Sequence, residues 1–188
     1  RLVALAGETL GTFSEIFSMI DNADLPLPEI ELDGKNTKIT HGTYGLILHS
    51  SDREKRKEAY EKYYGAYESL INTITSTYYG NVKKDVFLSK AYKYNSCLER
   101  ALSGEDVNEV VYRNLLEAVK SSFPAMHRYI ADRKKILGYD KLYFYDVYAP
   151  LVSDVDVKMD YDAAYEYVIK GLAPLGKEYQ DLLRRGHD

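Results

Sequence analysis

A single stripe of apolar side chains constrains the fold of this chain more than any other feature of its sequence. Its members recur at steps of three and four residues: Tyr60, Tyr63, Tyr67, Leu70, Ile71, Ile74 and Tyr78. The opposite face carries Arg53, Lys57, Glu58, Glu61 and Lys62. This spacing is typical of an amphipathic helix, and Ser51 with Glu54 matches a capping box at its start. The stripe therefore predicts one long helix whose apolar face packs against other elements.

Several other stretches repeat the helical spacing. Residues 2–23 predict two short helices, because Gly7 and Gly11 interrupt the apolar pattern. Further helices are expected at residues 40–49, 82–94, 106–137 and 160–183. Pro124 either kinks the helix that ends before Gly138 or starts a second one. The residues of that helix that we expect to face inward are Val111, Leu115, Ala118, Val119, Phe123, Met126 and Ile130.

Two stretches depart from the helical pattern. The segments EIEL and TKIT flank Asp33-Gly34-Lys35-Asn36, and Asp-Gly favours the backbone angles of a tight β-hairpin. Residues 142–152, LYFYDVYAPLV, are rich in aromatic and β-branched residues, which predicts a short extended segment. The expected fold is therefore mainly α and multi-helical, with one small β-hairpin and one short extended segment.

Composition excludes several classes of protein. The 188 residues carry a formal net charge of −4, which argues against a general attraction to nucleic acid or to an anionic membrane. No apolar run approaches the roughly 18 residues of a membrane span. Cys97 is the only cysteine, so an intramolecular disulfide is excluded, which fits a reducing cytoplasm. We expect a cytoplasmic protein with neither nucleic-acid nor membrane partners.

The residues that most often carry catalysis are scattered in this chain. The four histidines are His41, His49, His127 and His187, and no two have the three- or four-residue spacing of a zinc-binding helix. The Gly-rich phosphate loops and the serine-hydrolase elbow are also missing from the sequence. Residue chemistry alone therefore predicts a helical domain with no catalytic residue and no metal ligand of its own. The basic run at residues 133–135 fits a solvated helix face.

Six segments in order resemble oligoendopeptidase F, a zinc peptidase related to thimet oligopeptidase. They read AGETLGTFSEIFSMIDNADLPLPEI, ITHGTYGLIL, DREKRKEAYEKYY, YGNVKKDVFLSKAYKYNSCLERAL, FPAMHRYIADRKKILGYDKLYFYDVYAPLV and LAPLGKEYQDLL. The resemblance implies an almost entirely helical fold and a zinc ion held by an H-E-x-x-H helix beneath a deep channel. It also implies that residues 1–65 form the N-terminal module with its hairpin, and that residues 66–188 open the helical peptidase domain.

The zinc-binding half of that family has no counterpart in this sequence. His187 is followed by Asp188 rather than by the glutamate of the motif, so the resemblance places no zinc ligand on any residue here. We therefore expect a portion of a metalloendopeptidase that hydrolyses short oligopeptides, with zinc bound by the full-length parent and none by this fragment. The fragment alone would be inactive, would pair with the C-terminal catalytic half, and would self-associate through its uncovered apolar surface.

Residues 142–152 are the candidate wall of the substrate channel. Strand alternation would place Tyr143 and Tyr145 on one side and Asp146 and Tyr148 on the other. One side could hydrogen-bond a peptide backbone, which makes these four residues the predicted substrate-binding set. The alternative is a strand buried on both faces. A second function left open by the sequence is a free-standing helical module that binds a peptide or protein without catalysis.

Overall fold

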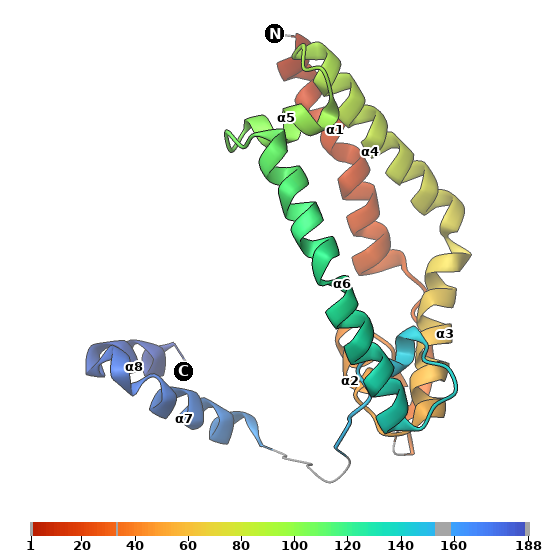
Figure 1. Cartoon of the computed structure of the whole chain (residues 1–188), viewed down its shortest axis with the longest axis vertical. Coiled ribbons are helices and arrows are strands. Elements are labelled where there is room, and N and C mark those ends of the chain that lie inside the picture. The colour runs from red at the N-terminus through yellow and green to blue at the C-terminus, as the bar shows by residue number, and fades with distance from the viewer. Residues whose placement is uncertain (1, 33, 153–158, 187–188) are drawn as a thin grey trace. The chain divides into compact units, whose positions relative to one another are not determined.

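The computed structural model describes residues 2–32, 34–152 and 159–186 (Figure 1). They belong to two compact units, Arg1–Leu151 and Val152–Asp188. Within the described residues the fold is mainly helical with one two-stranded antiparallel sheet, as the sequence predicted. The domain boundary predicted at residue 65 falls inside a helix and stays a prediction.

The first unit contains most of the described elements. In order these are α1 (Leu2–Met19) with a π-helical turn (Ile20–Asp24), β1 (Glu29–Leu32), β2 (Lys35–Lys38), α2 (His41–Leu48), α3 (Arg53–Ser69), α4 (Ile71–Ala91), α5 (Cys97–Ser103), α6 (Glu109–Leu137) and a 3-10 turn (Phe144–Asp146). The second unit contains α7 (Tyr161–Gly171), a 3-10 turn (Ala173–Leu175) and α8 (Lys177–Arg185).

The long predicted helix is divided into α3 and α4. The break lies at Leu70, whose backbone angles (φ −110°, ψ 12°) leave the helical region, so the prediction of one unbroken helix along the stripe was wrong. The Ser69 hydroxyl donates to the carbonyl of Ala66 over 2.6 Å, a bond that competes with the helical ladder. Asp52, rather than Ser51, caps α3 by accepting from the amides of the second and third helical residues.

Helix α1 runs without interruption through Gly7 and Gly11, so the prediction of two short helices was wrong. It lies against α4, as Figure 1 shows. The closest approach is at Gly80, where a Cβ atom would come within 2.3 Å of the Phe13 ring. Packing of α1 against α4 outweighs the modest cost of placing Gly7 and Gly11 inside α1.

The core of the first unit lies where the hairpin meets α2 and α3. The antiparallel register pairs Glu29 with Lys38 and Leu32 with Lys35, which confirms the predicted hairpin, and Gly34 takes a positive φ of 77° in its turn. The side chains that build this core are Ile30, Ile39, Ile47, Ala59 and Tyr63. Two predicted stripe residues of α3, Tyr63 and Tyr67, thus face the core, where their rings add apolar area.

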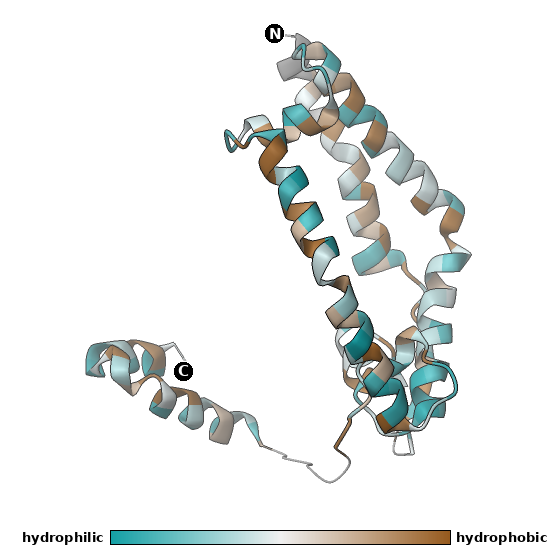
Figure 2. Cartoon of the chain, in the orientation of Figure 1, coloured by the Kyte–Doolittle hydropathy of each residue, from teal (hydrophilic) through white to brown (hydrophobic). Residues whose placement is uncertain are grey.

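Helix α6 does not bury the apolar face that its sequence predicts. It is a single helix that continues through Pro124, and the one residue of this helix that is buried is Arg133. The residues expected to face inward are exposed apart from Ile130, which is half-buried. Apolar residues recur along the length of α6 in Figure 2. The inward packing predicted for this helix is therefore wrong within the described chain.

None of the described helices combines the length and the apolar character that crossing a bilayer requires.

Candidate functional site

The predicted substrate-binding segment has no strand. Its central residues, Phe144–Asp146, form a 3-10 turn, so the predicted strand alternation was wrong. Neighbouring Tyr145 and Asp146 are both buried, whereas Tyr143 is 44% exposed and Tyr148 is 55% exposed. The structure therefore separates the four predicted residues into a buried pair and an exposed pair.

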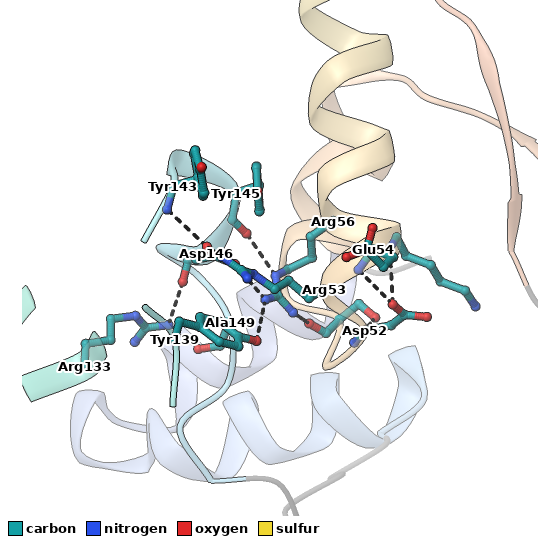
Figure 3. A network of polar contacts seen from close by, with 12 residues as sticks. Asp52, Arg53, Glu54, Arg56, Arg133, Tyr139, Tyr143, Tyr145, Asp146 and Ala149 are labelled. Atoms are coloured by element: carbon teal, nitrogen blue, oxygen red, sulfur yellow. Dashed lines mark hydrogen bonds and ion pairs between the residues drawn. The ribbon is translucent and has the colours of Figure 1, made fainter. Parts of the chain in front are cut away.

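Asp146 is the centre of a buried polar network (Figure 3). Its side chain is 0% exposed. Arg53 donates from Nε to Oδ1 over 3.1 Å and from Nη2 to Oδ2 over 2.9 Å, the bidentate geometry of a strong ion pair. Arg56 donates from Nη2 to Oδ1 over 3.0 Å, and the amide of Tyr143 donates to Oδ2 over 3.1 Å. The carboxylate therefore accepts two bonds on each oxygen.

Burial alone would raise the pKa of Asp146, because it disfavours the charged form. The hydrogen bonds from Arg53, from the Tyr143 amide and from Arg56 outweigh this effect and hold the pKa below its ordinary value. The same ion pair raises the pKa of Arg53. Asp146 is thus a permanently ionised anchor near neutral pH, not a proton donor or acceptor.

The two arginines of α3 fix the chain around residues 139–146. Arg56 is 0% exposed and donates to the carbonyls of Tyr145 (2.9 Å) and Ser50 (2.7 Å). Arg53 donates to the carbonyl of Lys141 over 2.9 Å. Its guanidinium lies 4.0 Å from the centre of the Tyr139 ring, in cation–π contact. The start of α3 and this distant segment therefore form one rigid unit.

Arg133 reaches the same turn from α6, as Figure 3 shows. Its side chain donates to the backbone carbonyls of Ala149 and Asp146, the latter over 3.4 Å, and to the Tyr129 hydroxyl over 3.3 Å. Its Nε is buried without a hydrogen-bond partner. Most buried polar atoms in proteins are hydrogen-bonded, so this donor needs an explanation.

A pocket of about 400 Å³ opens beside this network. Its lining residues are Tyr60, Ile130, Arg133, Leu142, Tyr143, Phe144, Tyr145 and Val147. Tyr143 and Tyr145 lie stacked, with ring centres 5.2 Å apart. Burial raises the pKa of Tyr145, so its phenol stays neutral. The pocket offers aromatic surface and one buried cation, which suits binding more than acid–base chemistry.

The described histidines and the cysteine lie in separate places. His41 Nδ1 lies 2.6 Å from the Tyr63 hydroxyl, His49 packs near the Tyr148 ring, and Cys97 is a free, exposed thiol. His187 lies outside the described residues. Within the described part of the chain, no three His, Cys, Asp or Glu side chains are placed to hold a metal ion. These residues do not fit a zinc site.

Sequence reasoning missed the arginines of this network. It placed Arg53 on the solvated face of its helix and Arg133 in a solvated basic run, but Arg53 is half-buried and Arg133 is 6% exposed. The only available signal was the three-residue spacing of Arg53 and Arg56, which puts both on one helical face. Their shared partner, Asp146, is about ninety positions away in sequence.

The family relationship is clear from comparison with known proteins. The sequence profile of Peptidase family M3 matches residues 46–180, which is most of the chain. The chain therefore belongs to Peptidase family M3, as its resemblance to oligoendopeptidase F predicted.

Named relatives and a solved structure agree with this assignment. The chain is 45% identical over 186 residues to oligopeptidase PepF of Bacillus subtilis (strain 168), covering 98% of the chain and 28% of that protein. It is 38% identical to group B oligopeptidase PepB of Streptococcus agalactiae, covering 98% and 31%. The crystal structure of oligoendopeptidase-F from Enterococcus faecium matches with a TM-score of 0.77 and 36% identity, covering 96% of the chain and 34% of that structure. The chain thus spans about a third or less of these relatives.

Proposed function

We propose that this chain is part of a metalloendopeptidase that hydrolyses short oligopeptides, and that it contributes a wall of the substrate channel. The observation that carries the proposal is the match of nearly the whole chain to proteins named oligopeptidases. Because the described residues do not fit a zinc site, the proposal assigns the zinc ligands to the remainder of the parent protein. The exposed thiol of Cys97 is compatible with the reducing cytoplasm.

The proposed partner of this chain is the C-terminal catalytic half of the parent. The uncovered apolar face of α6 supports this pairing, because exposed patches of this kind usually mark an interface. In isolation the same face is expected to drive self-association.

Within the wall, we assign substrate contact to Tyr143 and Tyr148. Their exposed phenols can donate to and accept from a peptide backbone without selecting a side chain. Tyr145 and Asp146 are buried, so their proposed part is to hold the turn that presents the exposed pair. This refines the predicted substrate-binding set into two contact residues and two positioning residues.

The function is tested by hydrolysis of a quenched fluorescent oligopeptide. We expect chelator-sensitive cleavage by a longer family polypeptide that includes this sequence, and no cleavage by the 188-residue chain alone. Metal analysis after dialysis should find zinc only in the longer polypeptide. One tightly held zinc per 188-residue chain, together with cleavage, would contradict the division of roles.

The contact residues are tested in the longer polypeptide by removing single hydroxyl groups. Tyr143→Phe and Tyr148→Phe should leave the melting temperature unchanged, and at least one should lower kcat/KM several-fold, because it removes a contact to substrate. Tyr161→Phe, at an exposed tyrosine of α7, is the matched control. Unchanged peptide kinetics in both variants would exclude these phenols from the channel wall.

The exposed face of α6 also favours the second candidate function, a helical module that binds a peptide or protein without catalysis. In that case no longer polypeptide carrying this sequence would cleave peptides, and α6 would be covered by a separate partner.

A further inference from the structure

The buried network beside the pocket contains more positive than negative charge. The guanidinium groups of Arg53 and Arg56 bond the single carboxylate of Asp146. A third guanidinium, that of Arg133, donates to the backbone carbonyl of Asp146. Both oxygens of that carboxylate are already used by the two arginines of α3 and by an amide. Arg133 has only neutral acceptors among the described residues. Within the described part of the chain its charge is therefore buried without a counter-ion, which is costly.

The position of Arg133 makes this imbalance accessible to a ligand. The residue is 6% exposed and lines the pocket of about 400 Å³. The other lining side chains are aromatic or aliphatic. This volume lies at the small end of the range of ligand pockets, roughly 300–1,000 Å³. A single residue with its flanking groups would fit within it.

We propose that this pocket binds a carboxylate carried by an apolar residue, with Arg133 as the counter-ion. A guanidinium fork matches the geometry of a carboxylate, and Arg133 lines the pocket. The apolar part of the ligand would lie against Ile130, Leu142 and Val147. Such a ligand offsets the buried charge and occupies the pocket at the same time.

Two sources can supply this chemistry. One is the C-terminal residue of a free peptide, which rests on the proposed function. The other is an Asp or Glu side chain, with its apolar neighbours, from the remainder of a longer parent. Both sources predict an open, competent pocket in the 188-residue chain. A free peptide would leave the pocket open in the longer polypeptide, whereas a side chain of the parent would already occupy it.

The test uses N-acetyl-leucine as the probe and N-acetyl-leucine amide as its uncharged match, titrated calorimetrically at neutral pH. The 188-residue chain should bind one acid molecule at least tenfold more tightly than the amide. Arg133→Met should abolish this preference, and Arg133→Lys should weaken it, because lysine lacks the fork. Arg128→Met, at an exposed position on the same helix, should leave it unchanged. The comparison of acid with amide stands on the unmodified chain even if Arg133→Met fails to fold.

The same titration on a longer family polypeptide distinguishes the two sources. Retained binding assigns the pocket to free carboxylates, whereas lost binding assigns it to a side chain of the parent. Equal binding of acid and amide by the 188-residue chain, or no saturable binding, overturns the proposal and leaves water as the partner of Nε. If the longer family polypeptide hydrolysed no peptide, the proposed function would be contradicted. The binding measured on the 188-residue chain would still decide whether the pocket takes a carboxylate.

Discussion

Replacement of Asp146 by Asn is expected to lower the free energy of unfolding by about 3–5 kcal/mol, the usual cost of removing one partner from a buried ion pair. The amide keeps the shape of the side chain but leaves Arg53 and Arg56 facing a neutral group that presents one acceptor oxygen instead of two. Arg56 is fully buried and cannot turn to water. Because domains have only about 5–15 kcal/mol of stability, this single change should remove a large fraction of it.

Urea unfolding of the wild-type chain and the Asp146→Asn variant measures this effect. Asp140→Asn makes the same chemical change at an exposed site six positions away, and it should shift the stability by no more than about 0.5 kcal/mol. Equal effects of the two substitutions would show that the network around Asp146 makes no specific contribution to the free energy of unfolding. The Asp146→Asn, Arg56→Met double variant should recover part of the loss, because it removes the uncompensated charge along with its partner.

The stabilisation by Asp146 should depend on pH in one direction. Its pKa in the folded chain lies below the ordinary value of 3.8, so the unfolded chain binds the proton more readily. The contribution is therefore complete above about pH 5 and is lost as the pH falls through the folded-state pKa. The stability difference between wild type and Asp146→Asn should be constant between about pH 5 and 8 and should shrink below about pH 4. A difference that grew on acidification would contradict this account.

The sequence predicted those parts of the fold that local chemistry decides. The Asp33-Gly34 turn located the hairpin, and the three- and four-residue spacing located α3, α4 and α6. The break at Leu70 was missed because the apolar spacing continues through it, while the Ser69 hydroxyl bonds to the carbonyl of Ala66 beside it. A bond of this kind leaves no periodic signal in the sequence.

The sequence predicted where the candidate site lies but not the backbone conformation of its segment. Aromatic and β-branched residues at 142–152 favoured a strand, whereas the Tyr143 amide and the two arginines of α3 hold a compact turn around Asp146. A carboxylate within an apolar run needs a partner or solvent. The partners lie about ninety residues away, so the sequence alone could not identify them.

Helix α6 gives the sharpest test of whether this chain is completed by further sequence. Leu115 is 60% exposed, so Leu115→Ala should change the stability of the 188-residue chain by no more than about 0.5 kcal/mol. In a longer family polypeptide the same change should cost about 2–5 kcal/mol, because a covered leucine leaves a cavity when it is truncated. The comparison needs only unfolding curves of four proteins.

Ile47→Ala serves as the matched control, because Ile47 belongs to the core that the hairpin forms with α2 and α3. Its truncation should cost about 2–5 kcal/mol in both the short and the long polypeptide. A charged residue at position 115 should also reduce self-association of the short chain, measured by sedimentation, because it interrupts the apolar face. If Leu115→Ala is equally mild in both polypeptides, the remainder of the parent does not cover α6. That face would then be free to bind a separate partner, as the non-catalytic module requires.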